Sequence, residues 1–532
     1  MKLYKSWSDH HQPNSFPPLS DKIAIKARKW KHGMLLPAGI LVALLMNLTG
    51  LLFVVLLIKE HHLFDCSSKE DETLLRHDEV PEMELDKLLG GLLLPGFDEK
   101  SCLSRYESVQ YLKELKRRPS SYLISRLRSY EDQHRRCGPH TEAYNKSLEF
   151  MIKSGKNTDC KYVVWALLFG FGNRLISMAS AFLYALLTNR VLLVSRLDHM
   201  SELFCEPFPG TSWYLPEDFP ISDAQFYRFD HNSSESYGNL VKNGLIDRFN
   251  GSTQLLPPFI YLSLTWDMDY YDELFFKDED QKFLQKITWL TMRSDEYFIP
   301  SLFLMPMFQK DLEKMFPEKD TVFHFLGRYL FHPTNPVWEL ITRYHQSYLG
   351  ADEKIGIQHV LDQIIACTMK EKILPPINQD NTQNRKNKTK SVLVTSLSSW
   401  YADVIRDMYW EHSGEVVQVH QPSHEEQQKW RETMHYKKAL AEMYLLGMSD
   451  RLVTMSGEST FGYVARGLGD LKSWVMYKPE NHTAPDPPCR RVVSMEPCFF
   501  LPPLDHTREI VPAYIMPCED RMRGIKLYQN TN

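Results

Sequence analysis

Residues 170–174 read Gly-Phe-Gly-Asn-Arg, a pattern suited to holding a phosphate or a sugar. Two glycines let the backbone approach a ligand closely, so main-chain N–H groups and the asparagine amide could donate hydrogen bonds to it. The spacing differs from the dinucleotide-binding G-x-G-x-x-G motif, because residue 175 is leucine. An ordinary tight turn would also need small residues here. The candidate ligand contacts are Gly170, Gly172, Asn173 and Arg174.

A second candidate binding segment covers residues 459–463, at the expected start of a helix. It offers two hydroxyl groups and several main-chain N–H donors, and a helix N-terminus attracts anions. The same serine and threonine would also serve as a plain helix cap. The candidate contacts are Ser459, Thr460, Phe461, Gly462 and Tyr463.

Charged residues supply two further candidates. Arg328 could contact an anion, although an arginine in such a segment can equally form a surface salt bridge. Asp267 and Asp269 form an Asp-x-Asp pattern of a kind that can hold a metal–diphosphate complex. No hydrophobic strand is expected to lead directly into these acids, so we expect no metal site. The motifs of serine hydrolases, zinc peptidases and P-loop nucleotidases are absent.

The first glycine segment lies inside an expected strand–helix–strand unit. Residues 162–167 are a short apolar run, residues 175–187 are apolar at helical spacing, and residues 190–194 form another apolar run. Two buried strands joined by a helix are typical of a parallel sheet. Residues 104–134 also have helical spacing, and Pro119 should divide them into two helices.

The C-terminal half repeats this architecture without repeating the sequence. We expect strands at 391–396, 416–419, 452–454 and 474–477, and helices at 401–410, 430–446 and 463–468. The sequence therefore predicts an α/β protein with two Rossmann-like lobes and a ligand between them, at the carboxyl ends of strands.

An apolar stretch near the N-terminus indicates a membrane anchor. Residues 34–58 contain no charged residue and are long enough to span a bilayer. Residues 1–33 hold seven lysines and arginines against two acids, whereas residues 59–90 hold ten acids against four bases. This asymmetry predicts a cytosolic tail (1–33), a transmembrane signal anchor (34–58) and a lumenal stem (59–94). Two folded lobes are expected at 95–335 and 336–532.

Other features agree with a lumenal location. The net charge of −5 provides no basis for a nucleic-acid partner. All nine cysteines follow the anchor, where an oxidising lumen would allow disulfides, and their odd number leaves at least one unpaired. Five Asn-x-Ser/Thr sequons predict glycosylation at Asn145, Asn232, Asn250, Asn387 and Asn481.

Ordered segments from about residue 85 to the C-terminus resemble the plant cell-wall α-1,2-fucosyltransferase family. The resemblance implies a GT-B-like, metal-independent, inverting enzyme of the Golgi membrane, with type II topology and no cofactor. It implies transfer of fucose from GDP-fucose to the 2-hydroxyl of a terminal galactose on xyloglucan or arabinogalactan chains. A second copy or another Golgi transferase is an expected partner. The matching segments are 87–92, 102–106, 125–128, 145–148, 170–194, 203–209, 328–333, 459–465 and 518–520.

The resemblance also suggests a residue on the acceptor side. Asp295 lies in a segment similar to the family's acceptor lobe, so its carboxylate is a candidate for orienting or deprotonating the galactose hydroxyl. A carboxylate at such a position can also be an ordinary surface residue.

One departure from the family pattern bears on activity. In the family, Gly-Ile-Gln is followed by a variable residue, an arginine that contacts the donor diphosphate, and about ten more residues. Here Gly356-Ile357-Gln358 runs directly into His359, and a strand would be lost with the arginine. A cysteine expected near residues 499–506 is also absent, which would explain the odd count. Two hypotheses remain open: a fucosyltransferase, impaired or mis-spliced, and a non-catalytic Golgi partner of active relatives.

Overall fold

The computed structural model describes residues 86–529, apart from the gaps 112–116, 154–158, 167–168, 249–256, 359–362, 377–387, 411–415, 456–458, 478–484, 504–510 and 520–522. Within these described residues, no helix is both long and apolar enough to cross a membrane. The predicted anchor at 34–58 lies outside them, so the membrane topology stays a prediction. Residues from Met83 onward form one compact unit by their internal contacts.

The N-terminal half contains a four-stranded parallel sheet with the order β2-β1-β4-β3. Every residue of the two strands predicted from apolar runs is buried, as expected for a sheet covered on both faces. The sequence analysis missed β3 and β4. The strand bounds are β1 Tyr162–Trp165, β2 Val191–Val194, β3 Phe259–Leu264 and β4 Trp289–Ser294.

The C-terminal half contains a six-stranded sheet with the order β10-β9-β8-β5-β6-β7, in which only β10 is antiparallel to its neighbour. The strands are β5 Glu353–Gln358, β6 Lys390–Thr395, β7 Val417–His420, β8 Arg451–Thr454, β9 Trp474–Met476 and β10 Cys489–Arg491. A separate hairpin pairs β11 Ile515–Pro517 with β12 Ile525–Leu527. The expectation that a strand is lost near Gln358 is wrong, because β5 is present and pairs with both β6 and β8.

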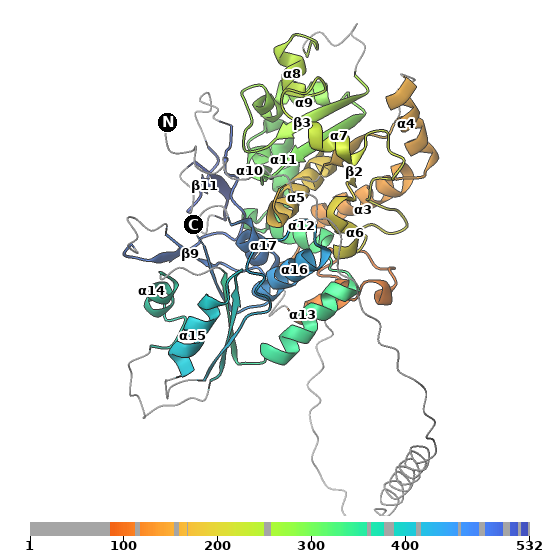
Figure 1. The fold of residues 1–532 in the computed structure, drawn as a ribbon. Coiled ribbons are helices and arrows are strands. Elements are labelled where there is room, and N and C mark those ends of the chain that lie inside the picture. Colours follow the sequence, from red (N-terminus) through yellow and green to blue (C-terminus); the bar gives the residue numbers. More distant parts are fainter. Residues whose placement is uncertain are drawn as a thin grey trace, which may run out of the picture. The chain divides into compact units, whose positions relative to one another are not determined.

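Helices cover both sheets (Figure 1). The α-helices are α2 Leu103–Glu107, α3 Ser121–Cys137, α4 Glu142–Lys153, α5 Phe171–Leu187, α6 Met200–Leu203, α7 Asp223–Arg228, α8 Tyr237–Lys242, α9 Asp278–Leu284, α10 Ile299–Phe303, α11 Pro306–Met315, α12 Val322–Leu330, α13 Asn335–Tyr348, α14 Gln363–Lys370, α15 Trp400–Trp410, α16 Thr433–Gly447 and α17 Thr460–Leu468. Short 3-10 helices are η1 Glu99–Ser101, η2 Ser108–Tyr111, η3 Leu197–His199, η4 Asp272–Phe276 and η5 Lys319–Thr321.

Four of these helices form the contact between the two halves of the chain. Figure 1 shows α5 and α12 from the N-terminal half beside α16 and α17 from the C-terminal half; α17 contacts both α5 and α12, and α16 contacts α17 and α6. Nearly every residue of α5 is buried, so this helix is apolar on all sides rather than on one stripe. The predicted glycine loop at 170–174 belongs to this helix: Gly170 is its N-cap, and Gly172, Asn173 and Arg174 lie in its first turn.

Four disulfides join cysteines that are distant in sequence: Cys102–Cys205, Cys137–Cys160, Cys367–Cys489 and Cys498–Cys518. All eight cysteines after residue 86 are therefore paired, and the odd cysteine is Cys66. The expectation that a cysteine lost near residues 499–506 explains the odd count is wrong, because Cys498 already has Cys518 as its partner.

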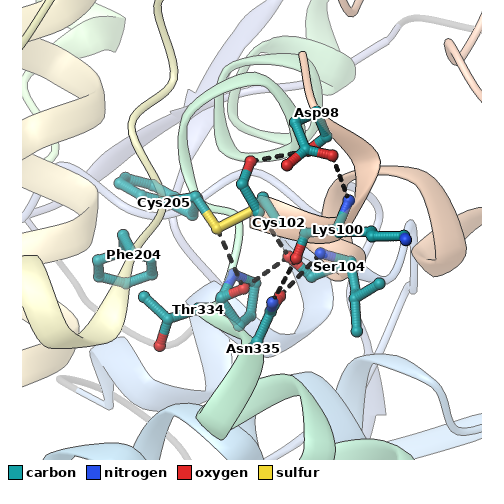
Figure 2. The surroundings of a disulfide bond; sticks show 12 residues. Asp98, Lys100, Cys102, Ser104, Phe204, Cys205, Thr334 and Asn335 are labelled. Atoms are coloured by element: carbon teal, nitrogen blue, oxygen red, sulfur yellow. Dashed lines mark hydrogen bonds between the residues drawn. A yellow bond between two sulfur atoms is a disulfide. The ribbon is translucent and has the colours of Figure 1, made fainter.

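The first disulfide fastens the start of the described chain to the segment that follows α6, and hydrogen bonds link both to the segment that leads into α13 (Figure 2). Next to the sulfur atoms, the Ser104 hydroxyl donates to the Pro333 carbonyl at 2.7 Å. Asn335 accepts from the Leu103 N–H at 2.9 Å and donates to the Lys100 carbonyl at 2.7 Å. One covalent bond and several hydrogen bonds thus hold together a corner of the fold that consists of residues 100–104, Cys205 and residues 333–335.

Candidate functional site

A cavity of about 320 Å³ lies where the two halves of the chain meet. Residues at the N-termini of α5 and α17 line it. The carboxyl ends of β5 and β6, the segment after β7 and one face of α16 complete the lining. The position matches the general rule that ligands of parallel α/β sheets bind at the carboxyl ends of strands. The lining residues from these elements are Gly170–Asn173, Gln358, Thr395–Leu397, Ser423, Glu425, Gln428, His435, Tyr436, Ala439, Glu442 and Ser459–Phe461.

The two predicted binding segments meet in this cavity. The Thr460 hydroxyl donates to the Asn173 side-chain oxygen at 3.0 Å. A Cβ at Gly172 would come within 2.5 Å of the Thr460 hydroxyl oxygen and within 2.9 Å of the Phe461 nitrogen, so only glycine allows this approach. Two helix N-termini, each with unpaired N–H groups and a positive dipole end, therefore face one space. This arrangement suits a ligand with more than one phosphate.

Several buried polar atoms of the cavity wall have no hydrogen-bond partner among the described residues. They are the Gln358 side-chain oxygen, the Thr395 hydroxyl and His435 Nδ1. The Gln358 amide nitrogen, by contrast, donates to the Ser459 hydroxyl, so the side chain is held in place by one end. A polar ligand in the cavity could supply hydrogen bonds that these atoms lack.

A buried carboxyl group, Glu442 on α16, also lines the cavity. Only 8% of the residue is exposed, and burial raises its pKa to about 8, although a hydrogen bond from the Ser423 hydroxyl acts in the opposite direction. Sequence reasoning missed this residue, because a glutamate in a predicted helix usually faces solvent. Nearby Glu425 differs: hydrogen bonds from Lys429 and Lys438 lower its pKa to about 2.

The two arginines that were candidate donor contacts do not line the cavity. Arg174 donates through Nε to the Phe169 carbonyl at 2.9 Å, and its guanidinium lies over the Tyr436 ring at 5.1 Å. It therefore supports a ring that does line the cavity. Arg328 is buried within α12, and burial lowers its pKa. Direct contact of either arginine with a donor stays a prediction.

Gly462 and Tyr463, the last residues of the second segment, lie just behind the cavity lining. A Cβ at Gly462 would meet the Gln358 side-chain oxygen at 2.5 Å, so glycine is needed for α17 to pack against the end of β5. Tyr463 is buried against Phe500, with the Arg466 guanidinium 4.3 Å from its ring centre. Both residues are placed to position the helix N-terminus; their direct contact with a ligand stays a prediction.

Asp295 follows directly after β4 and is connected to the cavity through its main chain. The Asn173 side-chain nitrogen donates to the Asp295 carbonyl at 3.1 Å, while the Asp295 carboxylate accepts the Trp266 N–H at 3.1 Å. Burial raises the pKa of this carboxyl to about 6; the Trp266 hydrogen bond opposes the shift, and neighbouring Asp267 adds to it. A carboxylate that titrates near 6 is suited to accept a proton at neutral pH.

The Asp-x-Asp segment lies beside Asp295, and one expectation about it is wrong. The hydrophobic strand β3 ends at Leu264, only three residues before Asp267, so a strand does lead into this loop. Asp269 accepts the main-chain N–H groups of Tyr271 and Asp272 at 2.8 and 3.0 Å, which gives it a structural role at the start of η4. Asp267 accepts from the Thr265 hydroxyl and lies 3.8 Å from His231.

Two of the five predicted glycosylation sites lie in the described part of the chain. Asn145 and Asn232 are both exposed, the first on α4 and the second in the loop before α8. Asn250, Asn387 and Asn481 lie outside the described residues. Glycosylation of all five stays a prediction.

Comparison with known proteins identifies the family. A family model described as xyloglucan fucosyltransferase matches residues 64–508. The chain is 52% identical to a galactoside 2-alpha-L-fucosyltransferase of Pisum sativum over 488 residues, which cover 86% of this chain and 85% of the relative. It is 52% identical to the Arabidopsis thaliana protein of the same name over 477 residues, covering 84% of both. The solved structure of an arginine-to-lysine mutant of Arabidopsis thaliana FUT1 in complex with GDP superposes with a TM-score of 0.76 at 51% identity, over 83% of this chain and 100% of that one. This chain, with its parallel α/β sheets and its cavity between two helix N-termini, belongs to the xyloglucan fucosyltransferase family.

Proposed function

We propose that this protein transfers L-fucose from GDP-fucose to the 2-hydroxyl of a terminal galactose on xyloglucan or on an arabinogalactan glycan. The names of the relatives and the GDP in the similar solved structure support this assignment. The observation that carries it is the cavity in which α5 and α17 present their N-termini to one space. We further propose a GT-B-like fold with lobes at 95–335 and 336–532, and a lumenal orientation behind a Golgi membrane anchor.

The donor diphosphate would occupy the end of the cavity formed by the two helix N-termini. Main-chain N–H groups from Gly172 and Phe461, and the hydroxyl of Ser459, can donate to its oxygens. In the reaction the bond between fucose C1 and the β-phosphate oxygen breaks, and its electron pair stays on the phosphate. Preorganised donors aimed at that oxygen stabilise the charge that develops on it. The proposal involves no metal ion, because the N–H and hydroxyl donors stabilise this charge by hydrogen bonds.

The acceptor would enter from the side of Asp295. The galactose 2-hydroxyl oxygen forms the new bond to C1, and its proton passes to the Asp295 carboxylate. Attack from the face opposite the leaving phosphate inverts the configuration at C1. Asn173 holds Asp295 by its main chain and Thr460 by its hydroxyl, so one amide side chain fixes the base relative to the donor helix.

Glu442 supplies a chemical reason for a guanine nucleotide. The Watson–Crick edge of guanine carries two adjacent groups that donate hydrogen bonds, N1–H and N2–H₂, and a carboxylate can accept both. Adenine lacks a hydrogen on N1, so it cannot make the same pair of bonds. A buried carboxylate that lines the cavity and can still accept hydrogen bonds is therefore a selective partner for guanine.

The missing arginine bears on the rate of this reaction. Because β5 ends normally at Gln358, the shortening affects only the connection between β5 and α14. The sheet and the two helix N-termini are retained, so GDP binding should persist. Loss of one preorganised donor to the leaving phosphate typically lowers turnover about 10²–10³-fold. A protein that binds GDP but transfers no fucose would instead fit the non-catalytic partner of active relatives.

Calorimetric titration of the glycosylated lumenal domain tests this proposal. We expect GDP to bind more tightly than inosine diphosphate, which lacks the N2 amino group, and much more tightly than ADP. Glu442→Gln should weaken GDP binding and reduce the preference over inosine diphosphate. Glu339→Gln, which changes an exposed glutamate on α13, is the matched control and should leave both affinities unchanged. Absence of GDP binding by the unmodified domain would refute the proposed donor.

A further inference from the structure

Two large aromatic side chains are exposed in the loop that follows β3. Trp266 is 60% exposed and Tyr270 is 70% exposed, on a stretch of only five residues. Two exposed aromatic side chains this close in sequence offer ring faces to a ligand. The loop is not part of the nucleotide cavity, since none of its residues lines it.

The backbone of this loop is fixed although its two rings are exposed. The Trp266 N–H donates to the Asp295 carboxylate at 3.1 Å, and the Met268 N–H donates to the Thr265 carbonyl at 3.0 Å. At the other end, the Asp269 carboxylate accepts from the Tyr271 N–H at 2.8 Å. A rigid loop that presents exposed rings loses little conformational entropy when a ligand covers them.

The polar groups around the rings determine what kind of ligand fits. Asp267 and Asp269 lie between the two aromatic residues, Glu273 follows in η4, and half-buried His231 lies 3.8 Å from Asp267, whereas Asp272 is buried. Carboxylates repel nucleic acids and acidic polysaccharides, whereas they accept hydrogen bonds from hydroxyl groups. Aromatic faces pack against the C–H face of a pyranose ring. Together these groups match a neutral oligosaccharide.

We propose that Trp266 and Tyr270 form a platform for the neutral glycan chain that carries the acceptor galactose. The inference rests on the proposed function and deepens it: the direct hydrogen bond between Trp266 and Asp295 places the platform beside the group that would deprotonate the galactose hydroxyl. Sugars one or more units away from that galactose lie on the rings. The platform thereby selects long acceptors over short ones.

The test is oligosaccharide binding by the lumenal domain with GDP bound, measured by calorimetry. The ligands are a galactose-terminated xyloglucan oligosaccharide and a galactose-terminated disaccharide. We expect Trp266→Ala and Tyr270→Ala each to weaken binding of the oligosaccharide about 5- to 10-fold and to change disaccharide binding less than 2-fold. Trp410→Ala, which removes an 85% exposed tryptophan at the end of α15, is the matched control and should change neither.

The outcomes separate this inference from the proposed function. If the unmodified domain binds GDP but not the oligosaccharide, or if both loop variants bind it as tightly as the unmodified domain, the platform is refuted while the donor site stands. Equal losses for both ligands also refute it, because the rings would then act only near the galactose. GDP affinity and thermal stability show whether each variant is folded. If Trp266→Ala does not fold, Tyr270→Ala decides, since Tyr270 lies at the other end of the loop from the residue that binds Asp295.

Discussion

Replacing Gly172 with alanine tests whether the N-termini of α5 and α17 form one donor site. The added Cβ would lie 2.5 Å from the Thr460 hydroxyl oxygen, 2.8 Å from the Thr460 carbonyl carbon and 2.9 Å from the Phe461 nitrogen. Two of these atoms belong to the backbone, so rotation of a side chain cannot relieve the clash. The helix ends must separate by roughly 0.5–0.9 Å to restore ordinary contact distances near 3.4 Å.

The expected magnitude follows from the bonds that this separation lengthens. Overpacking of this kind costs about 1–3 kcal/mol of folding free energy. In the complex, hydrogen bonds from one helix N-terminus to the diphosphate would become too long, and a bond to a charged group contributes about 1.5–3 kcal/mol. Since about 1.4 kcal/mol corresponds to a tenfold change in affinity, the dissociation constant for GDP should rise roughly 10- to 100-fold.

Calorimetry with GDP and thermal unfolding are the two measurements. Gly350→Ala is the control, because a Cβ there would have no neighbour within 4 Å, and it should bind GDP normally. Gly170→Ala is an intermediate case within the same segment, since its Cβ would meet only the Asn173 side-chain oxygen at 3.3 Å. If Gly172→Ala binds GDP as tightly as the unmodified protein and unfolds at the same temperature, the close approach of the two helices has no role in donor binding.

Three further predictions follow from the site. Burial raises the pKa of Glu442 to about 8, so its carboxyl is protonated in the free protein at pH 7. Guanine binding should therefore release a proton, and GDP affinity should increase from pH 6 to pH 8. Glu442→Gln should remove this pH dependence. Asp295→Asn should lower turnover at least 10²-fold while GDP affinity stays within 2-fold. Turnover of the unmodified protein should rise with pH through about 6, because the Asp295 carboxyl, with its raised pKa, then loses its proton. An unchanged turnover of the Asp295→Asn variant would remove Asp295 from the mechanism. A family-like segment can be inserted between Gln358 and His359: a variable residue, an arginine and about ten more residues. The insertion should raise the rate of fucose transfer about 10²–10³-fold, and EDTA should not change that rate. Equal rates before and after insertion would contradict our account of the arginine.

The sequence predicts β1 and β2 from runs that are apolar throughout, and it also predicts β6, β7 and β8, which contain polar residues as well. The residues of β1 and β2 are all buried, so the apolar character of these two strands indicates their buried position directly. Two of the missed strands carry polar residues at one or both ends: Arg293 and Ser294 in β4, and Glu353 and Lys354 in β5. In β5 a glycine also interrupts the pattern: Gly356 allows α16 to pack closely, because a Cβ there would meet Leu446 at 2.9 Å.

Only part of the candidate site was predicted from the sequence. The segments 170–174 and 459–463 can be recognised in the sequence, because glycine and small hydroxyl residues indicate a required backbone geometry. Glu442 is not visible, because the direction of a helical side chain depends on which helix face the fold buries, and α16 buries most of its faces. The link from Asn173 to Asp295 joins residues 122 positions apart, and only the folded chain brings them together.

The corner around the Cys102–Cys205 disulfide has a mechanical consequence. A pull on the chain ahead of Asp98 reaches a covalent bond at Cys102 and hydrogen bonds at Pro333 and Asn335 before it reaches any strand of either sheet. The load is thereby shared between the segment after α6 and the start of α13, which are distant from each other in the sequence. Tension applied to that end of the chain is therefore taken up first by the residues around this disulfide, and only then by the sheets.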